Sequence, residues 1–217
     1  MKQLNKLAEP QILLLNRKNW TEEYTTAPDT DRKKFERWGA IEIRETLNIE
    51  TLGKCAYCEG QVADISFPHV EHIIPKKIRP DLAHVWANLT LACQRCNNNK
   101  RDYYNPDLSI IDPYTDDIQE YLRFHGGFVT PNLGKIRGDI TVSKLKLNRM
   151  ELVSSRLSRV EGVRQMLERW FSAKGEIKEF LAEAISLDAD EGEFSSTVWE
   201  FLNYMGFECP KDNRSKL

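Results

Sequence analysis

Cys55-Ala56-Tyr57-Cys58 and Cys93-Gln94-Arg95-Cys96 are two C-x-x-C pairs, and 34 residues lie between them. Each tight turn of this kind can direct two thiolates at one ion, so the matched spacing predicts one tetrahedral zinc site. The alternative is two unrelated pairs of buried thiols. The fifth cysteine, Cys209, has no such partner, and we expect it to be a buried or idle thiol. The expected zinc ligands are Cys55, Cys58, Cys93 and Cys96.

The segment between the two pairs has a pattern of its own. Residues 62–74 are rich in Val, Ile and Phe and predict an extended chain, and residues 89–91 predict a strand that leads into the second pair. Asn97 follows the second pair directly and is expected to cap a short helix through Lys100. The segment therefore predicts a strand, a loop, a second strand and a helix, held at both ends by metal.

Outside this segment, helical periodicity alternates with stretches rich in Gly and Pro. The first 30 residues are expected to be mostly irregular, with a short ordered piece at residues 12–15. Apolar spacing predicts one helix before the cysteines and three after the turn-rich region. The expected elements are a helix over residues 31–47, turns over 103–138 with a short hairpin near 128–136, a long helix from Asn148 to about Lys174, and helices over 176–187 and 195–206.

Charge is unevenly distributed along the chain. The 217 residues carry 31 Lys and Arg against 33 Asp and Glu, a net charge of −2, which excludes a protein that coats nucleic acid through overall positive charge. Residues 70–101 carry six cations and two acids, a net +4, whereas residues 176–208 carry nine acids and one base, a net −8. The sequence contains neither a membrane-spanning apolar stretch nor a signal-peptide pattern, so we expect a soluble cytoplasmic protein.

Several residues between and after the cysteine pairs occur in a diagnostic order. His69-Val70-Glu71-His72-Ile73-Ile74-Pro75-Lys76 lies between the pairs, Asn88 precedes the second expected strand, and Asn97 follows the second pair. This order resembles the HNH nuclease family, whose ββα-metal (His-Me finger) core is often braced by a four-cysteine zinc site. The resemblance covers residues 55–101. It implies a metal-dependent endonuclease that hydrolyses phosphodiester bonds, with DNA as the default substrate and tRNA or another structured RNA as the rival.

The resemblance also implies roles for individual residues. His72 would be the general base, Glu71 a ligand of the catalytic divalent ion, and Asn88 the residue that ties the loop and orients the base. Asn97 stands where the family often has a histidine, as the second ligand of that ion. Because an amide oxygen is a hard neutral ligand, Asn97 suits Mg²⁺ or Mn²⁺ better than zinc.

The adjacent positions of Glu71 and His72 raise a geometric question. Neighbouring residues of a regular strand point to opposite faces, so both can serve one site only if the strand ends or bends there, as Pro75 favours. On a regular strand, His69 and Glu71 would share a face instead. A rival assignment therefore makes His69 a metal ligand or auxiliary base, and a third interpretation makes it a histidine that packs beside the cysteines.

The cations of this segment overlap the motif, so we expect them to contact phosphate. The alternative is an ordinary solvated basic surface. Two further histidines, His84 and His125, lack motif context and are expected to be structural or exposed. The expected phosphate contacts are Lys76, Lys77, Lys100 and Arg101.

The flanking sequences resemble one subgroup more closely. Residues 54–59, residues 71–76 and Thr141-Val142-Ser143-Lys144-Leu145-Lys146-Leu147-Asn148-Arg149 are similar to the HNH subunit of Septu-type and retron-associated antiphage defence systems. This resemblance, over residues 35–165, implies a partner ABC-type ATPase subunit, PtuA. In the retron setting it also implies a reverse transcriptase whose RNA–DNA hybrid restrains the nuclease. The sequence contains no P-loop, so the ATPase activity would come from the partner.

The expected fold is α+β, mainly α, with the zinc-braced ββα-metal core preceded by helices and followed by a helical C-terminal part. Two other functions compete: a non-enzymatic zinc-braced module that binds nucleic acid or protein, and a partner-free, restriction-like HNH nuclease. The acidic, aromatic-rich C-terminal region would either contact a partner or close the chain's own core. The expected parts are an N-terminal helical segment (1–53), the nuclease core (54–105), connecting loops with a short hairpin (106–147) and the C-terminal helical region (148–217).

Overall fold

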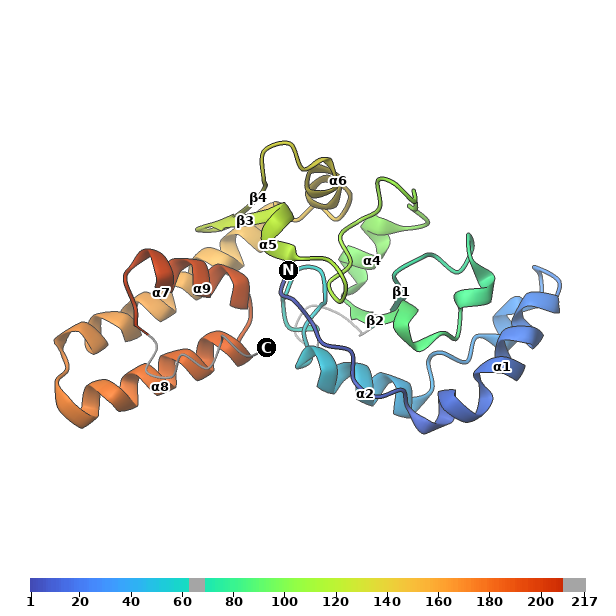
Figure 1. Cartoon of the computed structure of the whole chain (residues 1–217), viewed down its shortest axis with the longest axis horizontal. Helices are drawn as coiled ribbons and strands as arrows, with labels where there is room; N and C mark the ends of the chain where they lie inside the picture. The colour runs from blue at the N-terminus through green and yellow to red at the C-terminus, as the bar shows by residue number, and fades with distance from the viewer. Residues whose placement is uncertain (63–68, 209–217) are drawn as a thin grey trace.

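A computed structural model describes residues 1–62 and 69–208 of the chain. Helices dominate, and two separate two-stranded antiparallel sheets lie among them (Figure 1). The expected α+β, mainly helical fold is therefore confirmed. The described helices and strands are α1 (Gln11–Thr26), α2 (Ile41–Thr51), β1 (His69–His72), β2 (Leu89–Ala92), α4 (Gln94–Lys100), α5 (Ile118–Tyr121), β3 (Leu122–His125), β4 (Phe128–Pro131), α6 (Ile136–Lys144), α7 (Met150–Ser172), α8 (Gly175–Glu191) and α9 (Ser195–Tyr204).

The centre of the fold is a ββα unit. β1 and β2 pair antiparallel, with His69 opposite Ala92 and His72 opposite Leu89. Every residue of β2 is buried, and α4 follows it and lies against β1. The predicted strand near residues 89–91 is confirmed. Of the extended chain expected over residues 62–74, the part at 63–68 lies outside the described residues, and so does Cys209.

The N-terminal helices differ from the expectation in two ways. The supposedly irregular start contains α1, a 16-residue helix that buries only Leu13 and Tyr24 and therefore leaves little apolar periodicity in the sequence. The helix expected over residues 31–47 is wrong, because a 3₁₀ helix (Arg32–Phe35) is followed by a break before α2. At this break Ala40 is extended, and Trp38 is buried in the core.

The turn-rich region contains more structure than the sequence predicted. The hairpin is formed by β3 and β4, with Phe124 opposite Val129, so it begins earlier than the expected residues 128–136. Helix α6 corrects the interpretation of residues 106–147 as connecting loops with one hairpin. Gly138 lies inside α6, where a Cβ atom would come within 2.6 Å of the Tyr121 carbonyl oxygen. This glycine therefore permits close packing and does not mark a turn.

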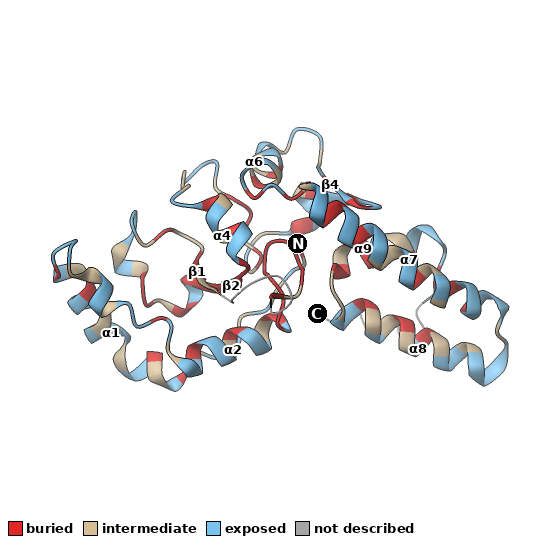
Figure 2. Cartoon of the chain, turned by 180° about the vertical axis from the view of Figure 1, so that it is seen from behind, coloured by how far each residue is buried: buried red, intermediate tan, exposed pale blue. Residues whose placement is uncertain are grey.

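The three predicted C-terminal helices are confirmed as α7, α8 and α9. They enclose a second buried cluster that includes Leu167, Trp170 and Leu202, separate from the main cluster around the cysteines (Figure 2). Phe207 also joins this cluster, whereas Tyr204 is 87% exposed. Most aromatic side chains near the end of the described chain thus close the protein's own core.

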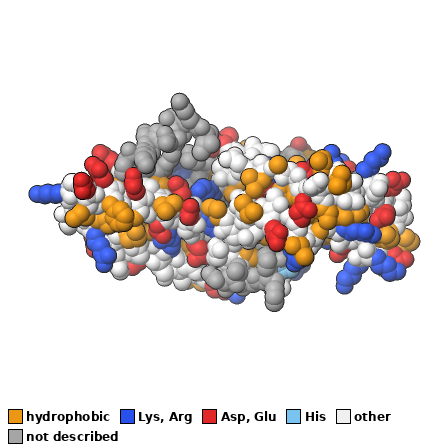
Figure 3. All heavy atoms as spheres, turned by 90° about the horizontal axis from the view of Figure 1, so that it is seen from below, with side chains coloured by type: hydrophobic (Ala, Val, Ile, Leu, Met, Phe, Trp, Pro, Cys, Tyr) orange, Lys and Arg blue, Asp and Glu red, His pale blue; other side chains and the backbone are white. Residues whose placement is uncertain are grey.

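The exposed side of α8 carries apolar residues of another kind. Ile177, Phe180 and Leu187 are exposed, and their spacing puts them on one side of the helix. Figure 3 views the molecule from the side on which α8 lies, and hydrophobic side chains form a row there with acidic side chains beside them. This surface is therefore both apolar and acidic.

Polar contacts join the first cysteine pair to the C-terminal helices. Lys54 Nζ donates to the carbonyl oxygens of Glu191 and Gly192 at 3.1 and 3.0 Å, where α8 ends. Glu59 Oε2 accepts from the backbone N–H of Ser196 at 2.9 Å, in the first turn of α9. No helix within the described parts of the chain is long and apolar enough to cross a membrane.

Candidate functional site

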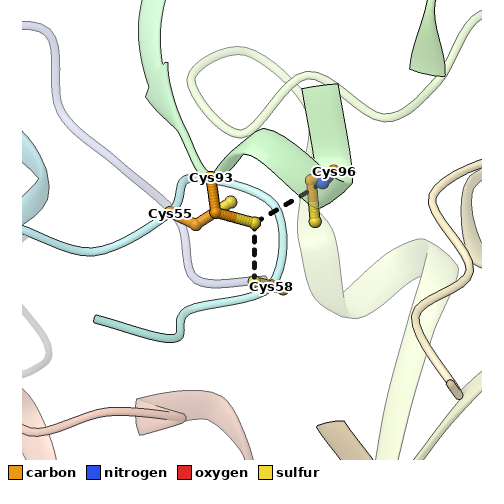
Figure 4. Close-up of side chains that lie close together, drawn as sticks. All are labelled: Cys55, Cys58, Cys93 and Cys96. Carbon is orange, nitrogen blue, oxygen red and sulfur yellow. Dashed lines mark hydrogen bonds between the residues drawn. The ribbon is translucent and has the colours of Figure 1, made fainter. Parts of the chain in front are cut away.

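The four paired cysteines converge on one point (Figure 4). Their sulfur atoms all lie within 4.8 Å of one another, and all four residues are buried. The Sγ atoms of Cys58 and Cys93 are 3.9 Å apart. Tetrahedral Zn–S bonds of about 2.3 Å would separate the sulfurs by about 3.8 Å, so the cluster has the size and chemistry to hold one zinc ion.

The second cysteine pair also sets the start of α4. Cys93 is the N-cap, and its Sγ accepts a hydrogen bond from the backbone N–H of Cys96 at 3.5 Å. The expectation that Asn97 caps this helix is therefore wrong, because the thiol of Cys93 takes the capping position four residues earlier and the helix begins at Gln94. Asn97 lies within the helix and not at its start.

Arg149 is a neighbour of the cysteine cluster that sequence reasoning did not identify. Its Nη1 and Nη2 atoms lie 3.8 and 3.9 Å from the Sγ of Cys96. Burial is the largest single influence and lowers the pKa of the guanidinium, but the nearby thiols of Cys96, Cys58 and Cys93 together outweigh burial, so the pKa is raised. Arg149 directly precedes α7, so a positive charge from the C-terminal part offsets thiolate charge in the core. The sequence signal that could have identified Arg149 was its position in the motif at residues 141–149.

Glu71 and His72 line the same cleft, next to the cysteine cluster. The cleft has a volume of about 540 Å³, and Asn97, Lys76 and Arg101 also line it. Both residues belong to β1 and are paired with β2, and the strand ends at His72, so the two side chains reach one cleft from the last two positions of the strand. His69 is not among the described residues that line the cleft.

The His72 imidazole is held by a hydrogen bond on one side and an aromatic ring on another. Its Nε2 lies 2.9 Å from the carbonyl oxygen of Ala83, and its ring centroid is 4.7 Å from that of Trp38, with the planes at 89°. A carbonyl only accepts, so Nε2 carries the proton and the lone pair is on Nδ1. Burial lowers the pKa of His72 to about 3, which keeps the ring neutral near pH 7.

Glu71 forms a buried ion pair with Lys100. Lys100 Nζ lies 2.6 Å from Glu71 Oε1 and 2.8 Å from the carbonyl oxygen of His72. Burial raises the pKa of Glu71, and the nearby ammonium of Lys100 opposes that shift. Lys100, one of the expected phosphate contacts, also lines the cleft, but its ammonium is buried and already paired with Glu71.

Asn88 ties together the loop between the two strands. Its side-chain Oδ1 accepts from the Ile74 N–H at 2.8 Å, and its Nδ2 donates to the carbonyl oxygens of Ile74 and Leu82 at 3.0 and 3.2 Å. Its own backbone carbonyl accepts from the Ile73 N–H at 2.9 Å. The loop closed by these bonds contains Ala83, the partner of His72, so Asn88 indirectly holds the position of His72.

The remaining cations and histidines lie in different environments. The Lys76 ammonium lies 4.2 Å from the centroid of the Trp38 ring, while exposed Lys77 pairs with Asp102 at 3.3 Å. His84 is fully buried and contacts aromatic rings, and burial lowers its pKa to about 4. Exposed Arg101 lies at the end of α4 and lines the cleft. Exposed His125 lies on β3, away from the residues that line the cleft.

Comparisons with known proteins agree with this geometry. A family model described as HNH endonuclease matches residues 55–102. The chain is 32% identical over 138 residues to the Septu protein PtuB of Bacillus thuringiensis, which covers 60% of this chain and 52% of the relative. It is 27% identical over 163 residues to the Septu protein PtuB of Bacillus mycoides (strain KBAB4), covering 61% and 55%. The chain spans about half the length of these curated relatives. The cysteine cluster, the ββα unit and the family match identify residues 55–102 as an HNH endonuclease domain, in a chain similar to Septu protein PtuB.

Proposed function

We propose that this protein is a metal-dependent endonuclease that hydrolyses phosphodiester bonds in the cleft beside the cysteine cluster. The observation that carries the proposal is the position of Glu71 and His72 on one cleft within a domain that matches the HNH endonuclease family. A module that only binds nucleic acid or protein would need the cysteine cluster and the basic residues. It would not need a buried carboxylate and a buried neutral imidazole side by side.

His72 acts as the general base in this proposal. Because its Nε2–H donates to Ala83, the Nδ1 lone pair is available to accept a proton from the attacking water. The low pKa of the ring keeps that lone pair free at neutral pH. Asn88 supports the base by fixing the loop that carries Ala83.

Glu71 and Asn97 would hold the catalytic ion. A carboxylate and an amide oxygen are hard ligands, and both residues line the cleft, which fits Mg²⁺ or Mn²⁺ better than zinc. A bound divalent ion supplies neutralisation of charge at the scissile phosphate and the leaving oxygen. Lys76 and Arg101 line the same cleft and would contact neighbouring phosphates.

The substrate in this proposal is DNA, with tRNA or another RNA as the competing outcome. The test incubates the protein with plasmid DNA and with total RNA, each with Mg²⁺ or Mn²⁺ and each with and without the ATPase partner. We expect cleavage by the wild type, none by His72→Ala, and full activity in His125→Ala, an exposed histidine away from the cleft. An active His72→Ala protein would overturn the base assignment. An inactive wild type under all conditions would favour the non-enzymatic module.

The biological role that we propose is effector of an antiphage defence complex with the ABC-type ATPase PtuA. The similarity to Septu protein PtuB supports this role, and the exposed apolar and acidic surface of α8 supports a protein contact there. Co-expression of the two neighbouring genes, followed by co-purification, tests the complex. A monodisperse, active protein without the ATPase would favour a partner-free nuclease, and a reverse transcriptase in the complex would favour the retron setting.

A further inference from the structure

Trp38 lies outside the matched domain, yet it contacts the site. The residue precedes α2 and is 7% exposed, and the family match begins only at residue 55. Its ring centroid lies 4.7 Å from the imidazole of His72 in a perpendicular arrangement. Edge-to-face pairs at this distance are attractive and depend on orientation. Trp38 therefore restricts the ring of the residue that we assign as the base.

The same indole ring contacts a cation of the cleft. The Lys76 ammonium lies 4.2 Å from the ring centroid, and it is also 3.4 Å from Glu36 Oε1. A cation over the face of an indole gains a cation–π interaction. Lys76 lines the cleft together with His72, so one side chain contacts two of the groups that face the substrate.

Trp38 is itself fixed by other aromatic rings. Tyr24 of α1 lies 5.4 Å away, centroid to centroid, at 83°, and His84 lies 5.3 Å away. The aromatic cluster joins α1, the segment before α2 and the loop between the strands of the ββα unit. Trp38 does not appear among the described residues that line the cleft, so it acts through its neighbours.

We infer that Trp38 is a positioning residue, which holds the imidazole of His72 in its productive orientation and the ammonium of Lys76 at the cleft. Among the described residues, the His72 side chain has one hydrogen bond, to Ala83, and this bond by itself allows the ring to tilt about it. The indole blocks that tilt. The N-terminal segment thereby completes a site whose chemical groups all lie in the HNH domain. This inference rests on the proposed nuclease function.

The kinetic test compares Trp38→Leu, Trp38→Phe and a matched control, Trp170→Leu. Trp170 is equally buried but belongs to the second cluster, around α7, α8 and α9. Because misplacement of a reacting group by about 1 Å can cost about 100-fold, we expect Trp38→Leu to lower kcat at least about tenfold. Loss of the cation–π contact should raise KM about two- to fivefold. Trp38→Phe keeps a ring beside His72 and should retain most of kcat, and Trp170→Leu should change the melting temperature without changing kcat.

A second measurement does not depend on activity. The ¹⁵N and ¹H resonances of the His72 imidazole report its tautomer and its hydrogen bond to Ala83 in the substrate-free protein. We expect Trp38→Phe to shift them modestly, Trp38→Leu to shift or broaden them, and Trp170→Leu to leave them unchanged. Unchanged resonances and unchanged kcat in Trp38→Leu would overturn the inference. If Trp38→Leu shifts the His72 resonances but the wild type cleaves no nucleic acid, the proposed function is overturned and the contact between Trp38 and His72 still stands. If Trp38→Leu does not fold, unchanged His72 resonances together with an unchanged KM in Trp38→Phe would overturn the inference.

Discussion

Lys100 and Glu71 form an ion pair with almost no contact with solvent: their charged atoms are 2.6 Å apart, and their side chains are 2% and 7% exposed. Removing one member of such a pair leaves the other charge buried without compensation, which costs about 3–5 kcal/mol. We therefore expect Lys100→Met to lower the free energy of unfolding by that amount in metal-free buffer, measured by urea denaturation. Mg²⁺ or Mn²⁺ should stabilise this variant more than the wild type, because a divalent ion would compensate Glu71.

The control for this prediction is Lys77→Met. Lys77 also pairs with a carboxylate, Asp102, but it is 76% exposed, so its loss should cost less than about 1 kcal/mol. Equal stability of the two variants would contradict the structural role of Lys100. If Lys100 instead contacted phosphate, Lys100→Met would weaken substrate binding and leave the metal-free protein as stable as the wild type.

The contact between Arg149 and Cys96 predicts an effect on zinc retention. Four thiolates around a bound Zn²⁺ would carry a net charge of −2, and the guanidinium beside Cys96 would offset part of it. Arg149→Gln should release zinc to a chelator about 10- to 100-fold faster, which a colorimetric zinc indicator measures. Arg95→Gln is the matched control, because Arg95 lies within the second C-x-x-C pair but bonds exposed Glu151. Equal release rates for both variants would contradict the prediction.

The cysteine cluster and the ββα unit were predictable because their signals are local. Cys55 to Cys58 and Cys93 to Cys96 each lie on one tight turn, and β2 is a short apolar run between them. The order of Glu71, His72, Asn88 and Asn97 can likewise be recognised from the sequence alone. Local residue order was therefore sufficient to locate the cleft.

Features that depend on tertiary contacts were missed. Helix α1 buries too few residues to show periodicity, and Gly138 looked like a turn although it permits the close packing of α6. A sequence does not show that Lys100 points inward, nor that Trp38 contacts His72 from outside the matched domain. Such contacts follow from packing between segments that are distant in the chain.

Asn88 should control the mobility of the loop that carries the partner of His72. Asn88→Asp keeps an acceptor for the Ile74 N–H but loses both donated bonds to Ile74 and Leu82. Each unpaired carbonyl costs about 1–3 kcal/mol if it stays buried. We expect faster amide exchange at Ile73 and Ile74 in this variant, and faster still in Asn88→Ala. Wild-type exchange in Asn88→Ala would show that other contacts hold the loop.

The buried ring of His84 predicts how stability depends on pH. Burial lowers its pKa from 6.5 to about 4, so between those pH values the unfolded chain binds a proton that the folded protein does not. Stability is therefore greatest above pH 6.5 and falls as the pH is lowered toward 4. Between about pH 7 and about pH 5 this residue alone would lower the free energy of unfolding by up to about 2 kcal/mol. His72, with its pKa also lowered, changes stability in the same direction.

His84→Phe removes this titration and keeps an aromatic ring among Trp20, Tyr24 and Trp38. Urea midpoints at about pH 7 and about pH 5 should differ less in His84→Phe than in the wild type. His125→Phe, which replaces an exposed histidine on β3, should keep the wild-type difference. An unchanged pH dependence in His84→Phe would mean that His84 binds its proton in the folded protein as readily as in the unfolded chain. The loss of stability at low pH would then come from His72 and from the carboxylates.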